Sequence, residues 1–161
     1  MKLKHILKIE QAKLLKNDIL EHLTNPINVL YRQPVSYYYI KLRSHERYDL
    51  VDIEQLSVIK EKSDNFDDEY DLYPTLMVEE MIELLFPVNI DEYVLKFETF
   101  IGGVPPRRVW NVAYINNEND IFSFGDNMVN ILFCSKAFTL IGSLFELYKK
   151  YKNYLEWKTK N

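Results

Sequence analysis

The chain contains little of what marks several specialised classes of protein. Its 161 residues include one cysteine, Cys134, so no disulfide can form within the chain. Four glycines and six prolines are too few for a fibrous or low-complexity protein. The longest apolar stretches, such as residues 128–133, fall far short of the roughly 20 residues that a membrane-spanning helix needs. These absences exclude a disulfide-stapled scaffold, a fibre and a membrane-spanning helix.

The distribution of charge predicts both the location and the division of the chain. Lysines interrupt the first eight residues, so we expect no export signal, and the single cysteine favours a soluble protein in a reducing cytoplasm. Residues 1–60 are mildly basic, whereas residues 61–72 are strongly acidic and lack apolar periodicity. The sequence therefore predicts an N-terminal subdomain at 1–60, a solvated linker at 61–72 and a second unit at 73–161, within one compact domain.

Abundant hydrophobic residues, 47% of the chain with 14% aromatic, supply a globular core. Residues 9–23 place apolar side chains at helical spacing and predict an amphipathic helix. Residues 29–42 are rich in β-formers interrupted by Pro34, so they predict one or two short strands. Residues 52–59 fit either a short helix or the end of a strand. The N-terminal third thus predicts a helix followed by short strands.

The second half of the sequence predicts a sheet enclosed by two helices. A first helix is expected to begin at Thr75, with the threonine hydroxyl as its cap, and a last helix is expected to begin with Ser135 as its cap. Alternating patterns at 93–100 and 109–115 predict strands. Further strand material is expected at 121–124 and 128–133. The predicted class is therefore α+β: an N-terminal helix and short strands, then a helix, an antiparallel sheet of three or four strands, and a helix.

Short motifs also follow one another in a particular order. They are IEQAKLLK at 9–16, a tyrosine-rich strand, YPTL at 73–76, WNVAY at 110–114, and a helix opened by Ser-Lys-Ala at 135–137. In this order they resemble small uncharacterised proteins of Bacteroidetes and their phages. The sequence departs from that pattern because it lacks a Gly-Phe after the first helix and a late tryptophan in the second. The resemblance implies a phage or mobile-element origin and no particular activity.

Signatures of metal, cofactor and catalytic sites are missing from the sequence. His5, His22 and His45 are scattered and form no H-E-x-x-H motif, and the acidic run lacks the pattern of a calcium loop. No G-x-S-x-G or phosphate-binding glycine motif occurs, and Cys134 at the end of an apolar strand is typical of a buried small hydrophobe. We therefore expect no metal, no cofactor and no catalytic site. The alternative is an enzyme or small-ligand binder with a site assembled from distant residues, such as a pocket lined by Cys134 and a histidine.

Nucleic-acid binding is disfavoured by the charge of the second half. The predicted helix–strand–strand–strand–helix order imitates a module that binds double-stranded RNA. Acidic residues nevertheless outnumber basic ones between residues 75 and 157, opposite to a phosphate-binding surface. The cluster of Lys149, Lys150 and Lys152 suits the C-terminal end of a helix. We predict no binding to duplex RNA or DNA.

The remaining function class is recognition of another protein. Pro105, Pro106, Arg107 and Arg108 are predicted at a hairpin tip, where guanidinium groups can bind a partner's carboxylates, although a plain hairpin connection also explains them. Tyr37 and Tyr39 are the other candidate contacts, because the tyrosines at 37–39 alternate faces. We predict a non-enzymatic phage or mobile-element accessory protein that binds a host protein or a second copy of itself and modulates a host system. An edge strand at 37–42 would favour a homodimer.

Overall fold

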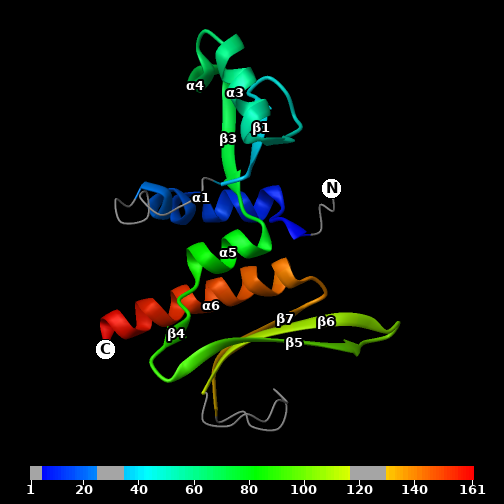
Figure 1. The fold of residues 1–161 in the computed structure, drawn as a ribbon, viewed down its shortest axis with the longest axis vertical. Coiled ribbons are helices and arrows are strands. Elements are labelled where there is room, and N and C mark those ends of the chain that lie inside the picture. The colour runs from blue at the N-terminus through cyan, green and yellow to red at the C-terminus, as the bar shows by residue number, and fades with distance from the viewer. Residues whose placement is uncertain (1–4, 25–34, 117–129) are drawn as a thin grey trace. The chain divides into compact units, whose positions relative to one another are not determined.

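A computed structural model describes residues 5–24, 35–116 and 130–161, and the chain divides into two compact units (Figure 1). Residues 6–80 form one, called here the N-terminal unit. The other, the C-terminal unit, comprises residues 81–161 together with residues 1–5. The boundary lies inside helix α5 (Val78–Leu85), well beyond the predicted linker at 61–72.

The N-terminal unit contains a three-stranded antiparallel sheet with the strand order β2–β1–β3. Helix α1 (Ile9–Thr24) precedes the sheet, which agrees with the helix predicted at 9–23. Strand β1 (Tyr37–Leu42) pairs with β2 (Asp49–Asp52) on one side and with β3 (Tyr70–Thr75) on the other. Since β1 is central, the prediction of an edge strand at 37–42 is wrong, and the argument for a homodimer from that edge no longer holds.

Helix α3 (Ile53–Lys62) follows β2 directly, because Asp52 forms a capping box at the end of that strand. The Asp52 side chain accepts a hydrogen bond from the Gln55 amide at 2.8 Å, and the Gln55 side chain accepts one from the Asp52 amide at 3.0 Å. Buried Leu56 of this helix packs with Ile40 and Val51 in the core of the unit. The ambiguous stretch 52–59 is therefore mostly helical.

The acidic stretch 61–72 differs from the predicted linker because its aromatic and apolar side chains are used in packing. It contains the end of α3, the short helix α4 (Phe66–Glu69) and the first half of β3. Phe66, Tyr70 and Leu72 pack against the core cluster of the N-terminal unit, and the rings of Phe66 and Tyr70 stack at 5.0 Å. Acidic side chains alternate irregularly with these packed residues, so the segment shows no regular apolar periodicity in the sequence.

The C-terminal unit contains a four-stranded antiparallel sheet with the order β4–β5–β6–β7. Its strands are β4 (Asn89–Ile90), β5 (Tyr93–Gly102), β6 (Arg107–Asn116) and β7 (Ile131–Ala137). Helix α6 (Leu140–Lys160) lies over one face of this sheet (Figure 1). The protein is thus an α+β protein, as predicted. Residues 25–34 and 117–129, which include the strand material predicted at 29–34 and 121–124, lie outside the described residues.

One face of β6 forms the core of the C-terminal unit. Val112 and Tyr114 are fully buried, and the Tyr114 ring lies 6.5 Å from that of Tyr151 on α6. The Tyr114 hydroxyl donates a hydrogen bond to the Pro87 carbonyl at 2.7 Å. Burial raises the pKa of Tyr114 well above its ordinary value, with a smaller contribution from Tyr151. The core therefore holds this tyrosine in its neutral form.

Both predicted helix caps prove to be strand residues. Thr75 ends β3, and its buried hydroxyl donates to the Leu7 carbonyl at 3.1 Å, while α5 begins at Val78 and the Glu80 carboxylate accepts from the Met77 amide at 2.9 Å. Ser135 lies within β7 and exchanges hydrogen bonds with Ser143. The cap of α6 is Thr139, whose hydroxyl accepts from the Gly142 amide at 3.1 Å. Both hydroxyl groups to which the sequence assigns a capping role instead form hydrogen bonds with other residues of the folded units, Leu7 and Ser143.

Candidate functional site

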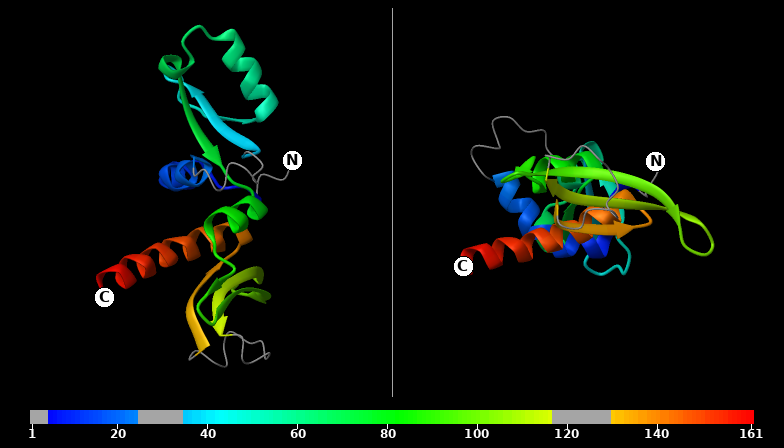
Figure 2. Two further views of the ribbon diagram at one scale, coloured as in Figure 1. Left: turned by 60° about the vertical axis from the view of Figure 1, so that its left-hand side comes forward. Right: turned by 90° about the horizontal axis from the view of Figure 1, so that it is seen from below.

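The β5–β6 hairpin ends in a stiff, exposed turn. Its last pairs are Ile101 with Arg108 and Gly102 with Arg107, and residues 103–106 connect them. Gly103 has a φ of 89°, in the left-handed region that favours glycine, and the Val104–Pro105 peptide bond is cis. Strand β7 pairs with β6 only from Trp110 onward, so the end of the hairpin is a two-stranded ribbon in the part of the sheet that the structure describes (Figure 2).

Large apolar side chains are exposed along this end of the sheet. Ile101 is 63% exposed, Phe138 is 58% exposed and Val104 is fully exposed. Phe97 and Phe100 on β5 are also exposed. Together with the two arginines these side chains make up what we call the hairpin-end surface: Phe97, Phe100, Ile101, Val104, Arg107, Arg108 and Phe138. Single exposed apolar residues are ordinary, but several gathered at one end of a sheet are typical of an interaction surface.

The two arginines of the hairpin-end surface keep their charge available. The Arg107 guanidinium lies 5.1 Å from the centroid of the Phe138 ring. Arg108 Nη1 donates to Thr99 Oγ1 at 3.3 Å. Neither arginine forms an ion pair with a residue that the structure describes. Their planar groups can therefore receive carboxylates from a binding partner.

The outer edge of β5 is the second feature of this region. Strand β4 pairs with β5 only at Tyr93 and Val94, and the Leu95 amide donates to the Val88 carbonyl at 3.4 Å. From Phe97 to Gly102 no described strand pairs with this edge. Unpaired backbone groups on an edge strand are a template for pairing with another chain.

Pro105, Pro106, Arg107 and Arg108 lie exposed at the hairpin tip, the position that the sequence predicts for them. Their contact with a partner stays a prediction. Phe100, Ile101 and Phe138 were missed. Phe100 and Ile101 are adjacent and lie on opposite faces of β5, yet both are exposed where the hairpin extends beyond its pairing with β7. No local pattern tells how far β7 reaches along the hairpin.

Tyr37 and Tyr39 belong to the N-terminal unit, and both are half-buried. The Tyr39 hydroxyl donates to the Leu7 carbonyl at 2.7 Å. Burial raises the pKa of Tyr39, and the nearby Glu10 carboxylate raises it further. Tyr38, on the opposite face of β1, packs against the core cluster, and burial followed by Glu80 raises its pKa. The structure thus gives Tyr39 an intramolecular role.

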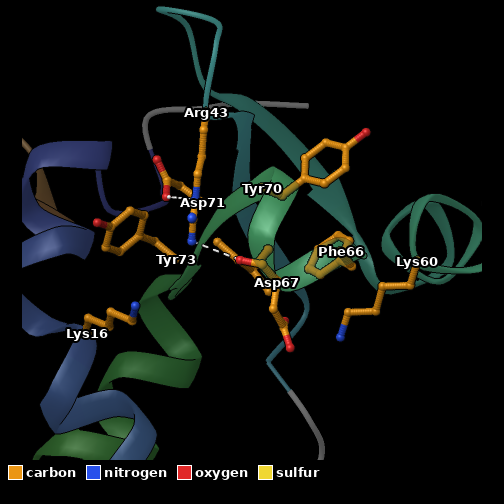
Figure 3. Close-up of a pocket in the computed structure, with 9 residues that line it drawn as sticks. Lys16, Arg43, Lys60, Phe66, Asp67, Tyr70, Asp71 and Tyr73 are labelled. Carbon is orange, nitrogen blue, oxygen red and sulfur yellow. Dashed lines mark hydrogen bonds and ion pairs between the residues drawn. The ribbon is translucent and has the colours of Figure 1, made fainter. Parts of the chain in front are cut away.

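A separate pocket of about 240 Å³ lies within the N-terminal unit (Figure 3). It is lined from α1, from the end of β1, from α3, from α4 and from β3. Three cationic side chains line it: Lys16 of α1, Arg43 after β1 and Lys60 of α3. Figure 3 shows Lys16 and Lys60 on opposite sides of the view, with Arg43 and Asp67 between them. Lys16 and Lys60, which are 44 positions apart in the sequence, thus line one cavity, and no sequence motif connects them.

Two cationic side chains balance the negative charge of the Asp71 carboxylate in this pocket. Arg43 Nε lies 3.4 Å from one of its oxygens, and Lys41 Nζ lies 3.5 Å from the other. Arg43 Nη2 also donates to the Asp67 carbonyl at 2.8 Å, which fixes the guanidinium at the wall of the pocket. Arg43 and Asp71 therefore form a fixed, charged wall of the pocket between the end of β1 and β3.

The lysines of the pocket face aromatic rings. Lys16 Nζ lies 4.8 Å from the centroid of Tyr73, and Lys60 Nζ lies 5.4 Å from that of Phe66. Neither ammonium group forms an ion pair with a described residue. Cation–π contacts hold the lysines in place, and no described carboxylate compensates their charge.

The residues considered for chemistry in the sequence are dispersed. Half-buried Cys134 lies in β7, where its backbone carbonyl accepts a hydrogen bond from Lys150, and neither it nor a histidine lines the pocket. No group of three metal-ligating side chains occurs among residues 5–24, 35–116 and 130–161. Lys149 forms an ion pair with Glu146 at 2.8 Å. None of the helices in those ranges is both long and apolar enough to traverse a membrane.

Comparison with known proteins identified no relative: no family model, no curated protein and no solved structure matches the chain. The chain's own residues are therefore the basis for proposing its function.

Proposed function

We propose that this chain is a protein-binding module that contacts its partner through the hairpin-end surface. The observation that carries the proposal is that Phe97, Phe100 and Ile101 are exposed on the part of β5 that lies beyond its pairing with β4. Aromatic residues and arginine are the side chains that contribute most to the affinity of protein interfaces. This composition supports recognition of another protein more than it supports chemistry.

The partner that fits this surface combines apolar and acidic groups. Ile101 and Arg108 are cross-strand partners on one face of the hairpin end, and Arg107 lies on the other face beside Phe138. A partner that grips this end would cover both apolar side chains and pair its carboxylates with both arginines. An extended segment of the partner can also add to the edge of β5 from Phe97 onward, where no described strand pairs with it. A host protein and a second copy of the chain are the two partners that the proposal includes.

The biological setting is part of the same proposal. The order of short motifs supports a phage or mobile-element accessory protein that modulates a host system, and the single cysteine supports a cytoplasmic location.

Retention of partners on the immobilised protein tests the proposal. The double variant Phe97→Lys/Ile101→Lys replaces two exposed apolar side chains of β5 with charged ones and should abolish retention of any protein held by the wild type. Leu14→Lys is the matched control, because Leu14 is 71% exposed on α1 and lies outside the hairpin-end surface. Equal retention by the wild type, the double variant and the control would contradict the proposal.

Sedimentation distinguishes the two partners. If a second copy binds, the wild type should sediment as a dimer at micromolar concentration and Phe97→Lys/Ile101→Lys as a monomer. If the wild type is a monomer, the partner is a different protein. A dimer that persists in the double variant would place self-association elsewhere on the chain.

A further inference from the structure

We propose that the pocket of the N-terminal unit binds a small anion, namely a single phosphate group in free or monoester form. The pocket is separate from the hairpin-end surface, so this inference does not depend on protein binding. Its support is the convergence of Lys16, Arg43 and Lys60 on one cavity, with two of these cations lacking a carboxylate partner among the described residues.

The lining of the pocket carries a net positive charge. Lys16, Arg43 and Lys60 line it against two carboxylates, Asp67 and Asp71, so the lining has an excess of one positive charge. A phosphate monoester carries a charge of about −1.5 to −2 at neutral pH and presents three acceptor oxygens. In a chain whose net charge is −4, this local excess is otherwise unexplained.

The surroundings of the pocket concentrate further positive charge. The rings of Tyr48 and Tyr73 meet edge to face at 5.8 Å, and Lys13 Nζ lies 4.6 Å from the centroid of Tyr48. Lys41 Nζ lies 5.6 Å from the same centroid. Ammonium groups gathered around two rings repel one another, and among them Lys41 is already compensated by the Asp71 carboxylate. A bound phosphate would offset the repulsion that remains.

The size and rim of the pocket restrict the ligand. Its volume of about 240 Å³ lies below the roughly 300–1,000 Å³ typical of sites for larger small molecules. Acidic residues of α4, from Asp67 to Glu69, stand beside the cavity and repel extended polyanions. The ligand is therefore a compact phosphate group, and a nucleic acid strand is disfavoured.

Titration of ¹⁵N-labelled full-length protein, followed by amide chemical shifts, tests the inference. The probes are inorganic phosphate, phenyl phosphate and a short single-stranded DNA. Saturable shifts at residues 16, 43 and 60 are expected with phosphate or phenyl phosphate. If phosphate binds more tightly, the ligand of the pocket is the free ion. If phenyl phosphate binds more tightly, the ligand is a phosphate monoester. Tighter binding of the DNA through the same lysines would overturn the inference.

Two variants with matched controls identify the residues responsible. Lys16→Gln and Lys60→Gln should each weaken binding about tenfold, because each removes a charged hydrogen-bond donor. Lys8→Gln and Lys62→Gln remove the same charge from the flank of α1 and from α3 without touching the pocket, so they should bind as the wild type does. Equal affinity in all four variants, or shifts that do not saturate, would refute a phosphate site.

The inference and the proposed function can fail separately. Phe97→Lys/Ile101→Lys should bind phosphate with wild-type affinity, because neither residue lines the pocket. Lys16→Gln should likewise retain the binding partner of the hairpin-end surface.

Discussion

Removal of the two hydroxyl groups that bind the Leu7 carbonyl should destabilise the N-terminal unit cooperatively. Thr75 Oγ1 donates to this carbonyl at 3.1 Å and the Tyr39 hydroxyl donates at 2.7 Å. Thr75 and Leu7 are both fully buried. The Leu7 amide in turn donates to the Leu76 carbonyl at 3.0 Å, so these bonds fasten the segment before α1 to the end of β3.

The loss of folding free energy depends on how many hydrogen-bond donors to the Leu7 carbonyl remain. Thr75→Val or Tyr39→Phe leaves the carbonyl one partner, so each should cost about 1 kcal/mol, the net value of a typical hydrogen bond. The double variant leaves a buried carbonyl without a partner, whose desolvation costs about 1–3 kcal/mol more. The loss in the double variant should therefore exceed the sum of the two single losses.

Native-state hydrogen exchange measures these losses. Amides of β1 and β3 report the opening free energy of the N-terminal unit, and amides of β6 serve as the internal control because they belong to the C-terminal unit. Strictly additive losses at β1 and β3 would refute the reasoning, since the two donors would then not share one acceptor. Equal losses at β6 would show that the variants act on the whole chain.

Three further outcomes are expected. Asp52→Ala removes the capping box of α3 and should cost about 1 kcal/mol in urea unfolding, with Gln55→Ala costing less. Leu144→Ala empties a fully buried position and should cost about 2–5 kcal/mol in the same assay; a loss below 1 kcal/mol would contradict the assigned core. The raised pKa of Tyr114 means that the unfolded chain loses this proton first. Stability should therefore be complete below about pH 10 and decline as pH rises above it, as followed by urea midpoints and tyrosinate absorbance.

Regular elements with strong periodicity could be predicted from the sequence. The helix at 9–23 and the strands at 93–100 and 109–115 agree with α1, β5 and β6, because one period dominates each segment. The errors involve side chains that act over long range. Thr75 and Ser135 have the chemistry of helix caps, yet they bond to Leu7 and Ser143 within the folded units.

The candidate sites divide in the same way. The hairpin tip could be predicted, because prolines and arginines between two alternating segments lie next to one another in sequence. The pocket could not, since Lys16, Arg43 and Lys60 come from three elements that only the fold brings together. The central position of β1 was also hidden, because strand order depends on pairing with β3, about 30 residues further along the chain.

Site-specific photo-cross-linking tests the central claim, protein binding at the hairpin-end surface, most directly. A photoreactive residue in place of Val104 samples the fully exposed tip, and one in place of Leu14 samples an exposed position on α1. Irradiation in cells of the source organism should join a defined protein to position 104 and not to position 14. The adduct should disappear when Arg107→Glu and Arg108→Glu are added. Absence of any adduct at 104, or the same adducts at both positions, would contradict the account.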